Sequence, residues 1–417
     1  MLQAMLAGVA SIKAQQTRMN VIGNNLANVN TTAYKGSRVT FQDMLAQTVR
    51  GASRPTGGLG GTNAIQFGLG VLVAGTDINT EQGSLNATNR PTDFAIQGNG
   101  FFLVSNGERL AYTRDGSFDL DANGDIVHRA TGERLMGWPA DPATGNINTN
   151  APISPASNLT VPIGARTAVQ VTTNVTYAGN LDSREFSNAG LASTQSIVRV
   201  FDSLGGSHDL TLTLTESATP NQWDWTVAGA GGTTVTGSGS LTFDPANGAM
   251  LTGSPGTITV TPPAAGGVPA FSVDLDFGGI SQLATEMQVQ ASSQNGFEPG
   301  SLSSFSVNTD GIIVGLYTNG LTRSLGQIAS AIFPNPNGLE RQGSNLWRNT
   351  DNSGVPVVGA PRSGGRGQIN AGFLEQSNID IGNEFTDLII TQRGFQANTR
   401  VVTTVDEMLQ DLINMKR

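Results

Sequence analysis

Two regular apolar stripes lie at the two ends of the chain. Hydrophobic side chains recur every three or four residues over the first thirty residues, and the last thirty-seven residues repeat the pattern. This spacing predicts amphipathic helices, and its near-heptad regularity favours a long, shallow crossing between them. The stripe positions are Leu2, Met5, Val9, Ile12, Met19, Ile22, Leu26 and Val29 at the start, and Ile381, Phe385, Leu388, Phe395, Val402, Val405, Leu409 and Leu412 at the end.

The bounds of the two helices follow from their flanking residues. We expect the first to run from about Leu2 to Val29, because the short polar side chains that follow compete for backbone hydrogen bonds. Asp380 or Asn383 can cap the second. Two such helices present more apolar surface than one antiparallel pair can hide, so we expect the stripes, from Met5 to Leu26 and from Phe385 to Leu412, to form a self-assembly interface. The alternative is that they cover the β domains of their own chain.

Between the helices, apolar positions alternate with a period of two residues in short runs bounded by Gly, Asn or Asp. Runs such as Phe101–Val104 and Leu210–Leu214 predict strands. A proline-rich stretch separates two groups of these runs. The segment Leu325–Ile332, in the later part of the chain, has a helical pattern instead.

These patterns predict a mainly β multi-domain protein with one β domain inserted in the other and terminal helices paired as a coiled-coil-like core. The predicted boundaries are 1–32 and 375–417 for the helical core, 33–70 and 359–374 for connectors, 71–148 and 282–358 for the first β domain, and 149–281 for the inserted second β domain. Gly57-Gly58 and Gly60-Gly61 predict an extended, pliable first connector.

Composition narrows the function classes. Of 417 residues, 53 are glycine and only 13% are charged, which is typical of a turn-rich extracellular β protein. A net charge of -9 with three lysines and no basic run argues against nucleic acid or an anionic membrane as partner. No stretch reaches the roughly 20 apolar residues that would insert in a membrane. Gln3 and Gly8 interrupt the only candidate signal peptide, so we expect export without a cleavable signal.

The sequence gives little support for a catalytic or metal-binding site. Asp119, Asp121, Asn123 and Gly124 imitate the start of a calcium loop, but Ala130 stands where a bidentate Glu is required, so a hairpin turn is the better interpretation. The two histidines, His128 and His208, fall in different predicted domains, and the chain has no cysteine. We predict no catalytic residues, no metal site and no cofactor.

A pair of tryptophans supports an alternative of another class. Trp223 and Trp225 lie on the same side of a predicted strand and would suit a sugar-binding platform, as in a secreted carbohydrate-binding β protein. An exposed strand face or partial core is the interpretation we prefer.

Several segments carry a resemblance to a known family. Residues 24–35 read NNLANVNTTAYK, residues 93–102 read DFAIQGNGFF, residues 112–118 read YTRDGSF, and residues 374–380 and 391–398 read LEQSNID and TQRGFQAN. In order and spacing the chain resembles the bacterial flagellar rod and hook axial proteins. The positions assigned to the family signature are Asn24, Asn25, Leu26, Ala27, Asn28, Tyr34, Lys35, Gln392, Arg393 and Asn398.

The resemblance implies a structural subunit and not an enzyme. It implies a helical homopolymer in the extracellular flagellum, exported by the flagellar type III apparatus, with rod proteins, a hook cap protein and a hook-filament junction protein as partners. The chain length and the large insertion favour a member that forms the hook, a curved, flexible universal joint that passes torque from rod to filament. A distal rod or junction member is the alternative.

One position departs from the family pattern. Ala33 stands where these proteins usually have glycine. If the backbone there requires a positive φ, Ala33 is strained.

Overall fold

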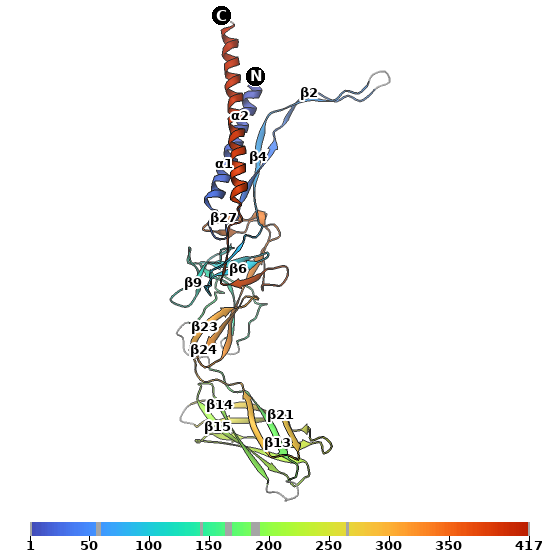
Figure 1. Cartoon of the computed structure of the whole chain (residues 1–417), viewed down its shortest axis with the longest axis vertical. Coiled ribbons are helices and arrows are strands. Elements are labelled where there is room, and N and C mark those ends of the chain that lie inside the picture. The colour runs from blue at the N-terminus through green and yellow to red at the C-terminus, as the bar shows by residue number, and fades with distance from the viewer. Residues whose placement is uncertain are drawn as a thin grey trace.

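The computed structural model describes residues 2–55, 60–141, 145–162, 169–184, 192–263 and 267–415. The chain forms an elongated molecule with a pair of helices at one end and a β sandwich at the other (Figure 1). Both termini lie at the helical end. The predicted mainly β fold with paired terminal helices is confirmed. Gly57 and Gly58 lie outside the described residues.

The two helices run antiparallel. Helix α1 spans Leu2–Ala27 and helix α2 spans Ile381–Asn414. Near the middle of the pair Asn398 donates to Ser11, and closer to the start of α2 Arg18 pairs with Asp387. Asp380 caps α2 as predicted, because its side chain accepts hydrogen bonds from the first backbone N–H groups of the helix. Helix α1 ends two residues before the predicted Val29.

A long ribbon lies beside the helices. Strand β1 (Ser37–Asp43) pairs antiparallel with β4 (Val71–Ile78), and both strands contact α1. The ribbon continues outward as an arm formed by β2 (Ala46–Arg50) and β3 (Ile65–Gly68) (Figure 1). The structure thus corrects two predictions. The described residues of segment 33–70 form β1, β2 and β3, and β4 pairs with β1 and not with the first β domain.

The first β unit is built from several sheets. Its main sheet has the order β27-β28-β8-β7-β11-β10-β9, with β26 paired to β7 and β29 paired to β26, and a four-stranded sheet has the order β12-β25-β24-β23. The strands before the insertion are β5 (Leu85–Ala87), β6 (Phe94–Gln97), β7 (Phe101–Ser105), β8 (Leu110–Thr113), β9 (Phe118–Leu120), β10 (Ile126–His128), β11 (Arg134–Leu135) and β12 (Gly137–Pro139). Those after it are β23 (Leu302–Val307), β24 (Ile312–Tyr317), β25 (Thr322–Ile328), β26 (Ser330–Ile332), β27 (Glu340–Gly343), β28 (Leu346–Arg348), β29 (Val357–Gly359), β30 (Gln368–Ala371) and β31 (Phe373–Glu375), with a 3₁₀ turn at Pro336–Gly338.

Core contacts move several predicted boundaries. The segment 359–374 is not a free connector, because β30 pairs with β6, β31 pairs with β5, and Ile369 is buried in the first core. Leu159 and Val161, predicted in the second domain, also belong to this core. The segment predicted to be helical, Leu325–Ile332, forms parts of β25 and β26.

The second β unit is a sandwich of two five-stranded sheets. Their orders are β17-β20-β21-β13-β22 and β14-β15-β16-β18-β19. The strands are β13 (Asn174–Asp182), β14 (Ser193–Phe201), β15 (Ser207–Glu216), β16 (Gln222–Gly229), β17 (Thr234–Thr236), β18 (Ser238–Phe243), β19 (Met250–Thr252), β20 (Gly256–Thr261), β21 (Phe271–Leu283) and β22 (Gln288–Gln294). Because β22 pairs with β13 and Val289 is in the sandwich core, this unit extends beyond the predicted end at residue 281.

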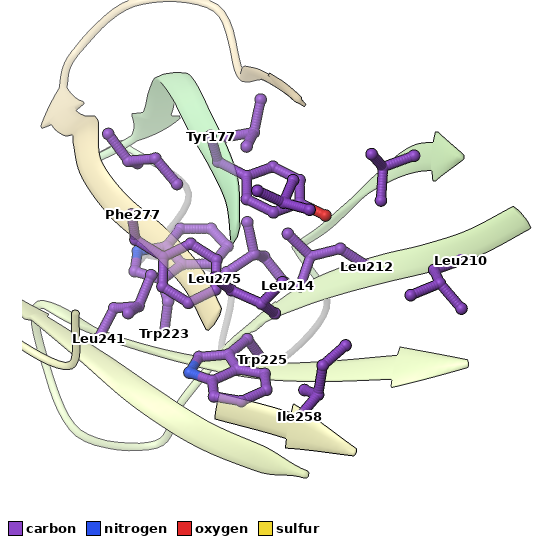
Figure 2. Packing of buried hydrophobic residues seen from close by; sticks show 14 of the residues in the cluster. Tyr177, Leu210, Leu212, Leu214, Trp223, Trp225, Leu241, Ile258, Leu275 and Phe277 are labelled. Atoms are coloured by element: carbon purple, nitrogen blue, oxygen red, sulfur yellow. The ribbon is translucent and has the colours of Figure 1, made fainter. Parts of the chain in front are cut away.

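The tryptophans of β16 fill the sandwich core. Trp223 and Trp225 point between the sheets beside Tyr177 and Phe277 (Figure 2). Both indoles are buried. They therefore offer no surface platform for a sugar, and the observation that favoured a carbohydrate-binding protein is removed.

Candidate self-assembly site

The predicted self-assembly interface on the two helices is only partly covered within one chain. Of the predicted interface residues, Ile22 and Val405 are buried. A second group is half-buried: Met5, Ile12, Met19, Leu26, Leu388, Phe395, Val402 and Leu409. A side chain at Gly8 would press against Val402, since an added Cβ would lie 3.1 Å from its Cγ2, so glycine allows close approach of the helices here.

Exposed apolar side chains lie on two sides of α2. Ile381, Phe385 and Ile389 recur every four residues on one side, Met408 and Leu412 lie four residues apart on another, and each of the five is 46–54% exposed. We call these five residues the outer stripe. Val9, on α1, is also exposed. One antiparallel pair thus leaves substantial hydrophobic surface in water, which marks an interaction surface.

A polar network joins the base of the helix pair to the chain that follows α1. The Asn25 amide donates to Glu384 Oε1 at 3.0 Å and to the backbone oxygen of Ser37 at 2.8 Å. Its oxygen accepts from the Ser37 N–H and from the Tyr34 hydroxyl. Burial raises the pKa of Glu384, and the hydrogen bond from Asn25 opposes that shift. Asn25 therefore ties both helices to the first residues of the ribbon.

Below this network lies a buried ion cluster. Lys35 Nζ lies 2.6 Å from Glu375 Oε1, and Arg114 Nε lies 3.6 Å from Glu375 Oε2. All three side chains are at most 5% exposed. Glu375 also accepts from the Gly83 N–H, and burial lowers the pKa of Lys35 although the Glu375 carboxylate opposes that shift. The cluster joins the segment after α1, strand β31 before α2, and the first β unit.

An arginine from the first β unit completes the junction. The Arg341 guanidinium lies 5.0 Å from the Tyr34 ring and 4.9 Å from the Trp347 ring, and it donates to the Lys35 backbone oxygen. Cation–π contacts of this kind strengthen when they are shielded from water. We use the word junction for Asn25, Tyr34, Lys35, Arg114, Arg341, Trp347, Glu375 and Glu384.

Comparison with known proteins identifies the family. Four family models match in order: flagella basal body rod protein (residues 5–35), flagellar hook protein FlgE/F/G D1 domain (95–177), flagellar basal body protein FlaE D2 domain (176–297) and flagellar basal body rod FlgEFG protein C-terminal (370–415). The flagellar hook protein FlgE of Borreliella burgdorferi is 39% identical, and the match covers 100% of both chains. The chain belongs to the flagellar hook protein FlgE family.

Further relatives include a second hook protein and a rod protein. FlgE of Escherichia coli is 32% identical over 98% of both chains, and the basal-body rod protein FlgG of Bacillus subtilis is 29% identical over 100% of both. The crystal structure of Helicobacter pylori FlgE2 covers 70% of this chain and 100% of its own, with a TM-score of 0.52 at 13% identity, which supports the fold alone.

The signature residues do not all meet at one place. Asn25, Tyr34 and Lys35 meet at the junction, and Asn398 joins the two helices. Asn28 donates back to Asn24 and helps to end α1. The structure places Ala27, Gln392 and Arg393 on exposed helix surface, away from the junction.

Sequence reasoning did not assign Arg114, Arg341, Trp347 or Glu375 to the site. Arg114 and Glu375 lie in segments that carry the family resemblance, and this resemblance was the sequence signal that could have pointed to them. Nothing in one sequence shows that Lys35 and Glu375, 340 residues apart, meet.

The other candidate sites have structural explanations. Asp121 Oδ1 accepts hydrogen bonds from the Asn123 and Asp125 N–H groups, so the calcium-like segment is a turn between β9 and β10. His208 lies 2.8 Å from Asp202 and also contacts Thr233. Over their described residues, neither α1 nor α2 has the length and hydropathy needed to cross a membrane.

Ala33 adopts the strained conformation that the sequence suggested. Its φ is 55°, its side chain is buried, and its N–H donates to the Glu375 backbone oxygen. We expect Ala33→Val to lower the free energy of unfolding by about 2 kcal/mol or more, because a β-branched residue fits this region poorly. Ala33→Gly should change it by less than about 1 kcal/mol, since relief of strain offsets lost burial and added chain entropy. Native-state hydrogen exchange at residues 33–37 of both variants tests this, and equal protection in the two would contradict it.

Proposed function

We propose that this chain is the structural subunit of the bacterial flagellar hook. In this proposal it polymerises into a curved, flexible tube that transmits torque from rod to filament. The observation that carries the proposal is the outer stripe, an exposed apolar surface on α2 in a chain that matches hook proteins over its whole length. The interface residues are those of the two terminal helices, from Met5 to Leu26 and from Phe385 to Leu412.

The outer stripe supplies enough cohesion for a polymer. Burying one Leu, Ile or Phe side chain contributes roughly 1.5–3 kcal/mol, so a few such contacts outweigh a large part of the cost of association. Since the stripe of one copy meets a different surface of the next, the contacts are heterologous and need not close into a ring. Repetition of such a contact builds a helical tube.

The junction gives the tube a means to pass force outward. Its ion cluster, amide network and stacked arginine connect the helix pair to the first β unit through buried contacts. Rotation of the helical core is thereby carried to the outer units. The low charge of the β units leaves few ion pairs to break when their mutual contacts change in a bent tube.

The glycine-rich segment 33–70 is the part of the chain expected from sequence to deform as the hook bends. The structure makes the first four of these residues unsuitable, because residues 33–36 are buried in the junction. The arm and the contacts between outer units remain as the pliable parts in our proposal.

The proposed partners follow from the hook assignment. They are further copies of the same chain, rod proteins, the hook cap protein, the hook-filament junction protein and the flagellar type III export apparatus. We also propose that the chain reaches the extracellular hook without a cleavable signal peptide and acts without catalysis.

Removal of both helices tests the role in assembly. A variant without residues 2–29 and 381–417 should keep its β units folded but form no tubes, because it lacks both stripes. Electron microscopy of intact and truncated protein measures this, with circular dichroism as the folding control. Tubes formed equally well by the truncated chain would overturn the proposal.

The full-length match to FlgG favours a second candidate, a distal rod subunit. The two differ in the shape of the polymer. Curved polymers formed by the purified chain support the hook, whereas straight, stiff ones support the rod.

A further inference from the structure

A cavity of about 330 Å³ lies beside the junction, in the first β unit. Its walls include Phe101, Phe333, Leu339 and Trp347. Two of these rings pack edge to face, with the centroids of Phe101 and Phe333 5.7 Å apart. An apolar, aromatic cavity of this size falls in the range that holds small ligands.

Two cations share one wall of this cavity. Lys35 and Arg114 both line it, and they lie close together because both contact Glu375. Among the described residues, Glu375 is the only carboxylate that pairs with either of them. Two buried cations therefore share one anion, and the wall has an excess of positive charge.

We propose that this cavity binds an amphipathic carboxylate, meaning an apolar or aromatic body that carries one carboxylate group. The body packs against Phe101, Phe333 and Trp347, while the carboxylate lies at the wall formed by Lys35 and Arg114. A second anion there balances the charge of the cluster, and charge-assisted hydrogen bonds to a buried cation are stronger than neutral ones. The binding does not depend on the proposed hook role.

Two sources can supply this chemistry. One is a free organic acid. The other is a second copy of the chain, which presents Asp43 between Phe41 and Leu45 at the root of the arm. All three residues are exposed, and none of the ion pairs among the described residues includes Asp43.

A matched pair of probes tests the charge requirement. We expect 3-phenylpropionate to bind the dilute full-length chain about tenfold or more tightly than 3-phenylpropionamide, measured by isothermal titration calorimetry. The two probes share the same apolar body, so the difference reports the carboxylate. Equal affinities, or no binding at millimolar concentration, would overturn the proposal.

Three variants test the location of the site. Leu339→Trp fills the cavity and should abolish binding of both probes, whereas Arg348→Ala, at an exposed arginine outside the lining, should leave it unchanged. Arg114→Gln should remove the preference for the acid. If Arg114→Gln does not fold, the ratio of the affinities of the two probes for the unchanged chain still tests the charge requirement. Binding that survives Leu339→Trp would contradict the assignment.

The assembled polymer separates the two sources. If polymer binds 3-phenylpropionate as the dilute chain does, a free acid is the occupant. If polymer excludes the probe and an Asp43→Asn polymer binds it, the carboxylate of a second copy is the occupant. Exclusion that Asp43→Asn does not relieve would overturn the second-copy source.

Discussion

Glu375→Ala is expected to lower the free energy of unfolding of the junction by about 3–5 kcal/mol, because it leaves Lys35 and Arg114 buried without their shared carboxylate. The side chain of Glu375 is fully buried and also holds the Gly83 N–H. Without this carboxylate, the desolvation of the two cations is no longer compensated, and the Gly83 N–H loses its hydrogen bond. The loss should appear first as faster hydrogen exchange at residues 33–37 and at β31.

A surface ion pair provides the control for this change. Glu340 pairs with Arg348, but both side chains are about half exposed. We expect Glu340→Ala to cost less than about 1 kcal/mol. Because the chain has several units, exchange should be compared residue by residue and not through one unfolding midpoint. Similar effects of the two substitutions would show that the buried cluster does not stabilise the junction.

Phe385→Ser with Leu412→Ser is expected to abolish assembly at concentrations where the unchanged chain forms tubes. Both side chains belong to the outer stripe and are about half exposed in one chain, so the fold should change by less than about 1 kcal/mol. In the polymer, losing two buried apolar side chains removes roughly 3–6 kcal/mol per subunit. That loss raises the critical concentration by about a hundredfold or more.

The matched control for this variant replaces polar residues of the same helix. Gln396→Ser with Gln410→Ser introduces the same residue type at exposed positions outside the outer stripe. Sedimentation of polymer measures assembly, and circular dichroism shows whether α2 still forms. Normal polymerisation of the Phe385→Ser, Leu412→Ser variant, or equal loss in both pairs, would contradict the assigned interface.

The periodic parts of the fold were predictable because their signal is local. The stripe at three- or four-residue spacing located both helices, and the carboxylate of Asp380 marked the start of α2. Alternation in runs such as Leu210–Leu214 likewise located β15. Ala33 was singled out through the family resemblance, since it stands where these proteins usually have glycine, the residue that a left-handed backbone favours.

The remaining features depend on contacts between distant segments. Ile369 was assigned to a connector, but β30 pairs with β6 and buries it. Alternation along β16 does not show whether Trp223 and Trp225 face solvent or core, because that depends on the second sheet that packs over this strand. The junction is the extreme case, since charged residues are usually exposed and only pairing across the whole chain makes their burial possible.

The placement of both chain ends at one pole has a consequence for how this protein tolerates change. The sandwich occupies the opposite pole, and its core shares no residue with the helices among the described residues. A loop there, such as the turn between β15 and β16, can accept a foreign peptide tag without disturbing the axis of the molecule. A substitution in the sandwich core therefore leaves the packing of α1 against α2 unchanged.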